Sequence, residues 1–181
     1  VSTFKAPVYT NISLDEPVIL AFHQVFSQEA NNKFEELIEK TKGVNVVVPS
    51  WFVMTDNQGN YSSIASRDYV EKAHARGIQV WAMLNNVSTK ESAAINTREL
   101  MGSTSNRKKL IASLMEDADN YGFDGINLDF EGLKAEAGPH YVQFIRELSV
   151  ACRQKGLVLS VDNYVPSAYT NFYNRREQGT V

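Results

Sequence analysis

Residues 124–131 read Asp-Gly-Ile-Asn-Leu-Asp-Phe-Glu, and this stretch decides the fold that we expect. From Ile126 onward apolar and polar residues alternate, so a β-strand would place Asn127, Asp129 and Glu131 together on one face. In an antiparallel sheet with one solvated face, such an alternation needs no function to explain it. The neighbouring segments therefore determine how the stretch is interpreted.

Those neighbours predict a parallel sheet. Four further runs are rich in Val, Ile, Leu, Phe and Trp, which is typical of strands buried on both faces. The five expected strands are residues 18–25, 44–54, 78–85, 123–131 and 157–164.

Amphipathic segments between these runs predict helices. Ser105 is expected to cap the helix before residues 123–131, and Pro139 to lie in the first turn of the next helix. Glycines that follow helix-like segments predict left-handed helix ends. They are Gly43, Gly77, Gly122 and Gly156. The repeated strand-helix order gives the fold class α/β.

In such a sheet the polar face of residues 126–131 would be buried, which costs several kcal/mol per charge unless partners are supplied. This cost indicates a functional site. We expect Glu131 to end the strand. Active sites of parallel α/β folds lie at the carboxyl ends of strands, so this position is where a catalytic residue would be expected. Asp129 would lie one layer below, about 6–7 Å away. Their repulsion and burial should raise the pKa of one carboxyl, so that Glu131 could hold a proton near neutral pH.

A carboxylic acid beside a carboxylate suits general acid catalysis of glycosidic cleavage. A metal site is the alternative, and we favour it less because the stretch contains no histidine. We expect no metal and no cofactor.

Composition excludes other classes of protein. The 181 residues are 43% hydrophobic and 22% charged, which argues against intrinsic disorder. The net charge of −3 argues against a nucleic-acid partner. No apolar run approaches the ~20 residues of a membrane span. Cys152, the single cysteine, is expected to pack as a small apolar side chain.

Residues 124–131 resemble the signature of glycoside hydrolase family 18, the chitinase-like enzymes. Its pattern is Asp-x-x-(Asp/Asn)-x-Asp-x-Glu on the fourth strand of a (β/α)₈ barrel. Residues 46–54, 56–60 and 69–84 are similar to the bacterial branch of spore-cortex and cell-wall lytic enzymes. The resemblance implies action on β-linked N-acetylglucosamine polymers, either chitin or peptidoglycan, outside the cell or at the wall or spore.

The resemblance also implies residue roles. Glu131 would protonate the glycosidic oxygen and later activate water, while the substrate's own N-acetyl oxygen attacks the anomeric carbon with retention. Asp129 would orient the acetamide and stabilise positive charge. Asp124 and Asn127 would support Asp129, and many members have aspartate at the position of Asn127.

Candidate substrate-binding residues lie near strand ends. Trp51 is the preferred sugar platform and Tyr164 a second aromatic candidate, with core packing as the alternative for both. His23 and Asn86 would line the cleft. Asp162 shares a strand face with Tyr164 and is a candidate member of the polar cluster.

The length matters because a (β/α)₈ barrel needs ~250 residues. We expect residues 1–16 to be a lead-in and residues 17–181 to be the first five β/α units, with apolar edges at the first and fifth strands. The rest of the native chain or a neighbouring chain would supply the missing half of the barrel. Residues 1–181 alone would then be a very weak catalyst or none.

Two other functions remain open from the sequence. The first is a chitinase-like protein that binds carbohydrate without cleaving it, although such proteins typically lose the acid found here at Glu131. The second is a flavodoxin-like domain that binds a nucleotide or flavin. It lacks a glycine-rich loop after the first strand.

Overall fold

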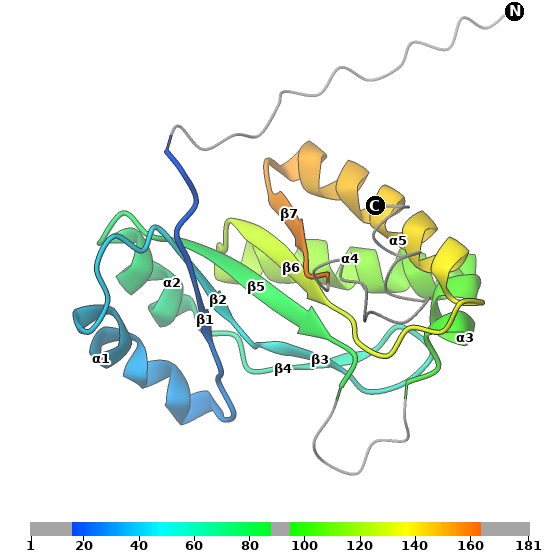
Figure 1. The fold of residues 1–181 in the computed structure, drawn as a ribbon, viewed down its shortest axis with the longest axis horizontal. Coiled ribbons are helices and arrows are strands. Elements are labelled where there is room, and N and C mark those ends of the chain that lie inside the picture. The colour runs from blue at the N-terminus through cyan, green and yellow to red at the C-terminus, as the bar shows by residue number, and fades with distance from the viewer. Residues whose placement is uncertain (1–15, 88–94, 164–181) are drawn as a thin grey trace, which may run out of the picture.

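The computed structural model describes residues 16–87 and 95–163. Parallel strands lie side by side in one curved sheet, as Figure 1 shows. In spatial order they are β1 (Leu20–His23), β2 (Val46–Pro49), β5 (Gln79–Asn85), β6 (Gly125–Asp129) and β7 (Val158–Val161). These strands confirm the parallel sheet predicted from the apolar runs.

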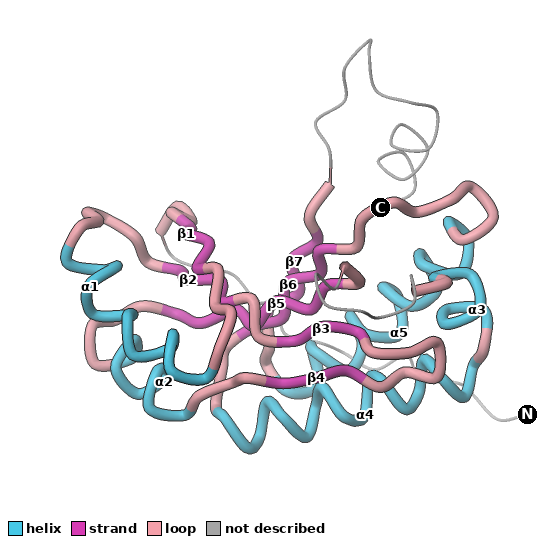
Figure 2. Tube along the Cα trace, turned by 90° about the horizontal axis from the view of Figure 1, so that it is seen from below, coloured by secondary structure: helices cyan, strands magenta, loops and turns pink. Residues whose placement is uncertain are grey.

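The helices lie on the outer side of the curved sheet (Figure 2). They are the 3₁₀ segment η1 (Gln28–Lys33), α1 (Phe34–Glu39), α2 (Arg67–His74), α3 (Thr97–Gly102), α4 (Thr104–Tyr121) and α5 (Gly138–Lys155). A doubly wound sheet carries helices on both faces. The flavodoxin-like alternative is therefore wrong, and the described residues form part of a (β/α)₈ barrel.

Helix ends follow the sequence closely. Gly122 and Gly156 end α4 and α5 with φ of 78° and 71°, the left-handed conformation that glycine adopts without a steric penalty. The predicted cap Ser105 is wrong. Ser103 caps α4 instead and its Oγ accepts the Asn106 N–H, because the chain turns directly after α3.

The second predicted strand is divided. β2 ends at Pro49, and β3 (Phe52–Met54) pairs with the end of β5 and with antiparallel β4 (Tyr61–Ser63). The break has a local cause at Ser50. Its Oγ accepts the Val25 N–H (2.8 Å) and donates to the Val25 carbonyl (3.2 Å), which draws the chain toward the end of β1.

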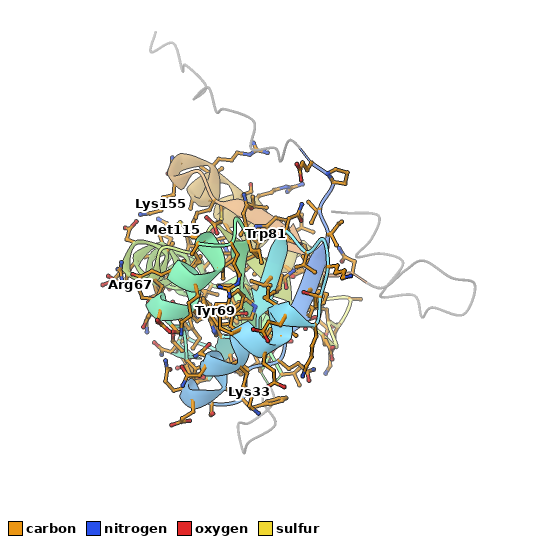
Figure 3. All side chains as sticks on the ribbon, turned by 90° about the vertical axis from the view of Figure 1, so that its left-hand side faces the viewer. Lys33, Arg67, Tyr69, Trp81, Met115 and Lys155 are labelled. Atoms are coloured by element: carbon orange, nitrogen blue, oxygen red, sulfur yellow. The ribbon has the colours of Figure 1, made fainter. Side chains whose placement is uncertain are left out.

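Most of the core lies between the sheet and the helices. Figure 3 shows Tyr69 in the middle of the molecule, whereas Lys33, Arg67 and Lys155 lie toward its outline. A smaller cluster of Val46, Val48, Trp81 and Met83 packs on the inner face of the sheet. The inner face therefore carries apolar side chains as well as polar ones.

The close packing of this inner face predicts a stability effect at Gly125. A Cβ there would lie 2.7 Å from Trp81 Cδ1 and 2.9 Å from the Val158 carbonyl oxygen. Gly125→Ala is expected to destabilise the protein by about 1–3 kcal/mol, measured by urea unfolding, because ring and strand must shift. Gly138→Ala is the matched control, since a Cβ at Gly138 meets nothing within 4 Å. Equal midpoints for the two variants would contradict this packing argument.

The first strand has an apolar edge, as the sequence predicted. Phe22 on β1 is 53% exposed, and Phe26 just beyond it is 76% exposed. Val18 and Ile19 before the strand are also exposed. Within residues 16–87 and 95–163, no helix combines the length and the apolar composition that crossing a membrane requires.

Candidate active site

Glu131 lies just beyond the carboxyl end of β6. The strand was expected to run through Glu131 but ends at Asp129. The side chain of Glu131 is exposed, and its backbone is fixed from the neighbouring strand. Asn86 Oδ1 accepts the Glu131 N–H (2.8 Å), and Asn86 Nδ2 donates to the Glu131 carbonyl (2.9 Å). At Glu131 these two side-chain bonds take the place of backbone bonds between β5 and β6, so β6 ends two residues earlier than the sequence pattern predicted.

The amide of Asn86 is therefore committed to the backbone of Glu131. Asn86 is 9% exposed, and both ends of its side chain are engaged. Sequence reasoning placed Asn86 in the cleft as a substrate ligand. Asn86 lines the smaller of the two cavities described below, and its contacts also position the backbone of the candidate acid.

This arrangement predicts the effect of Asn86→Ala in the full-length protein. We expect kcat to fall about tenfold or more with little change in KM, because a misplaced catalytic group is costly. Ser103→Ala is the matched control. It removes a helix cap, which lowers the free energy of unfolding by about 1 kcal/mol, but it lies away from Glu131. Steady-state kinetics that changed equally in both variants would contradict the positioning.

Two adjoining cavities border the carboxyl ends of the strands. A cavity of about 870 Å³ is lined by His23, Trp51, Asn85, Asp129 and Asp162, among others. A second, of about 600 Å³, is lined by Asn86, Arg98, Glu131, Lys134 and Glu136, among others. Val87 lines both. Asp129 and Glu131 thus face neighbouring hollows, and a chain-like ligand crossing from one to the other would pass both.

Asp129 has an altered acidity. Burial raises the pKa of Asp129 above its ordinary value, and repulsion from Asp162 and Glu131 raises it further. The sequence pattern predicted the raised pKa for Glu131. In the structure a raised pKa is found for Asp129, which is half-buried in the cavity wall.

Asn127 is completely buried below Asp129. Its Nδ2 donates to Ser160 Oγ (3.2 Å) and to Asp162 Oδ1 (3.0 Å) on and just beyond β7. Its Oδ1 has no hydrogen-bond partner among the described residues. The expectation that Asp162 joins the polar cluster is confirmed by this contact.

Asp124 lies at the opposite end of the strand. It lies five positions before Asp129, roughly 16 Å along a strand. Its Oδ2 accepts the Val80 N–H (2.8 Å) and lies 2.8 Å from His74 Nε2. The structure thus separates Asp124 from the carboxyls that it was expected to support, and gives it a part in holding β5, β6 and α2 together.

Trp51 does not offer an open face to a sugar. It is 1% exposed, and its Nε1–H donates to Asn31 Oδ1 (2.7 Å). Its ring meets Tyr69 edge-on, with centroids 5.2 Å apart. The expected platform is wrong, and core packing, the alternative, is the observed state. Neither Asn31 nor its contact could be found from sequence spacing.

His23 lines the larger cavity from the end of β1. Its Nδ1 lies 3.0 Å from the Tyr69 hydroxyl, and the two rings stack with centroids 5.7 Å apart. Burial lowers the pKa of His23, which favours the neutral imidazole. Tyr164 lies outside the described residues. Among the described residues, no group of three or more His, Cys, Asp or Glu side chains is placed to hold a metal ion.

Comparison with known proteins identifies the family. The profile of glycosyl hydrolases family 18 matches residues 17–176. The chain belongs to this family. A search of curated proteins finds no match.

Solved structures share the fold of the family 18 chain. A chitinase from Chromobacterium violaceum ATCC 12472 matches with a TM-score of 0.69 and 22% identity, over 90% of this chain and 53% of its own. A class V chitinase from Pseudomonas fluorescens Pf-5 matches with a TM-score of 0.72 and 14% identity, over 92% and 52%. The spore cortex-lytic enzyme SleL of Bacillus megaterium QM B1551 matches with a TM-score of 0.68 and 16% identity, over 85% and 36%. The chain spans about half the length of the two chitinases.

Proposed function

We propose that this family 18 chain carries the catalytic acid of a retaining, substrate-assisted glycosidase. Its substrate would be a β-linked polymer of N-acetylglucosamine, chitin or the glycan of peptidoglycan. The observation that carries the proposal is the pair Asp129 and Glu131 at the carboxyl end of β6. One carboxyl has a raised pKa, and the other is held through its backbone by Asn86.

The two carboxyl groups would divide the chemistry. Glu131 would donate a proton to the departing glycosidic oxygen, after which the substrate's acetamide oxygen bonds to the anomeric carbon and forms an oxazolinium ion. Asp129 would orient the acetamide and stabilise the positive charge. Glu131, now a carboxylate, would remove a proton from the water that opens the ring with retained configuration.

The adjoining cavities support this division. The larger contains Asp129 and would receive the sugar whose acetamide takes part, while the smaller contains Glu131 and would receive the leaving sugar. Between them the scissile oxygen would reach Glu131. We place the activity outside the cell, at a cell wall or spore, where such polymers occur.

The complete site requires more of a barrel than the described strands. β1 and β7 are the two ends of the run of parallel strands among the described residues, and the exposed Phe22 and Phe26 lie at the first of them. We propose that further β/α units close the barrel there, from the native chain or from a neighbouring chain. Activity is therefore to be measured on the full-length protein.

The test offers the full-length protein N-acetylglucosamine oligomers, chitin and purified peptidoglycan. New reducing ends should appear with at least one of them, and NMR of the first product should show the β-anomer. The α-anomer as first product would overturn the retaining mechanism. Binding of the oligomer without any cleavage would favour the carbohydrate-binding alternative.

A further inference from the structure

Asp162 lies opposite Asp129 on the inner face of the sheet. In the ladder between β6 and β7, Val158 pairs with Gly125 and donates its N–H to the carbonyl of the preceding residue (3.0 Å). Asp162 makes the same kind of contact with Leu128, the residue before Asp129 (2.8 Å). Because neighbouring strands are about 4.8 Å apart, the two carboxyl groups occupy one part of the cavity wall, and both line the larger cavity.

Asn127 fixes Asp162 in this place. Its buried Nδ2 donates to Asp162 Oδ1 at 3.0 Å, across the boundary between the two strands. The amide of Asn127 therefore fixes the carboxyl group of Asp162 beside Asp129.

The described residues around Asp129 supply no positive charge that would offset its carboxyl neighbours. Glu131 follows on the same chain segment, Asp162 faces Asp129 from β7, and His23 lines the same cavity from β1. Burial lowers the pKa of His23, which favours its neutral form. Among the described residues that line this cavity, none is Lys or Arg. Crowded carboxyls without a cation retain a proton more readily than isolated ones.

We propose that Asp162 is a positioning residue of the active site: the Asn127 amide holds it, and its carboxyl group faces Asp129 across the boundary between β6 and β7 and disfavours the ionised form of Asp129. A carboxylate that the family pattern allows at the position of Asn127 is here supplied from the next strand. The buried Oδ1 of Asn127, on the same strand as Asp129, has no hydrogen-bond partner among the described residues. The catalytic consequence rests on the proposed function, whereas the effect on the proton does not.

The test is the titration of Asp129 in the full-length Asp162→Asn protein. Side-chain carboxyls of ¹³C-labelled aspartate are followed by NMR against pH, and the Asp129 signal is assigned by its loss in Asp129→Asn. The midpoint of Asp129 should move to lower pH when the charge of Asp162 is removed. An unchanged midpoint would overturn the proposal. The readout needs no turnover, so it stays valid even if the proposed glycosidase activity fails.

Two further variants distinguish an effect of the Asp162 charge from an effect of packing. Ser160→Ala removes the neutral partner of the Asn127 amide and should leave the Asp129 midpoint unchanged. The double variant Asn127→Asp/Asp162→Asn exchanges the two side chains, so one carboxyl and one amide remain. It should return the midpoint of the Asp129 titration toward that of the parent. The exchange also serves if Asp162→Asn alone does not fold. Failure of the exchange to restore the midpoint would attribute the effect to packing and refute the positioning.

Activity gives an independent readout of the same proposal. In Asp162→Asn, the alkaline limb of kcat should move to lower pH, with a loss of activity that grows as the pH rises. KM should change little, because Asp162 acts through Asp129 and not on the substrate. A loss that is uniform across pH would argue against control of the Asp129 proton.

Discussion

The full-length Glu131→Gln protein should bind N-acetylglucosamine oligomers as the parent does and cleave them about 10²–10⁴ times more slowly. Glutamine has nearly the same shape as glutamate but carries no transferable proton. The backbone bonds from Asn86 involve only the main chain of Glu131, so the substitution leaves them intact. Reducing ends released per unit time measure the loss, and calorimetry measures the retained binding.

Glu136→Gln is the matched control for this prediction. Glu136 is another exposed glutamate that lines the same cavity, but it lies outside the motif of residues 124–131. Its substitution should leave turnover within about twofold of the parent. An aryl glycoside should lose less activity in Glu131→Gln than a natural oligomer does, because a phenolate leaves without full protonation. Undiminished cleavage of the natural oligomer by Glu131→Gln would refute the assignment of the acid.

The sheet could be predicted because its signals are local. The continuous apolar runs match β2, β5 and β7, and the glycines that precede such runs match helix ends such as Gly122 and Gly156. Both patterns reflect burial and backbone geometry within a few residues. Alternation likewise predicted that Asn127 and Asp129 share a face, and both line or support the polar end of the sheet.

The parts of the site that depend on distant contacts could not be read from the sequence. The end of β6 at Asp129 follows from the side chain of Asn86, which reaches Glu131 only once β5 and β6 lie side by side. The burial of Trp51 depends on Asn31 and Tyr69, which come from separate helical segments. No spacing in the sequence encodes either contact.

Asp129→Asn is expected to have the second large effect on activity. If Asp129 stabilises the oxazolinium ion, an amide in its place removes that stabilisation and should lower kcat about 10²-fold or more. The loss should be larger for substrates with an N-acetyl group than for any residual activity on deacetylated oligomers, since only the former can assist. Initial rates on the two substrates measure the difference, and equal losses would contradict a part for Asp129 in acetamide chemistry.

The same substitution should make the protein more stable at neutral pH. A carboxyl whose pKa is raised by folding, as burial raises that of Asp129, binds more protons in the folded state than in the unfolded state. The free energy of unfolding therefore decreases as pH rises from the unfolded pKa of about 3.9 through the folded one. Asparagine carries no such charge, so Asp129→Asn should match the parent below about pH 4 and exceed it increasingly toward neutral pH. Urea unfolding at several pH values measures this difference.

A variant less stable than the parent at pH 7 would mean that the Asp129 carboxylate finds compensating partners, and the raised pKa would then need another cause. A gain in stability together with the loss of activity is the result expected of a carboxyl that is kept in an unfavourable place for its chemistry.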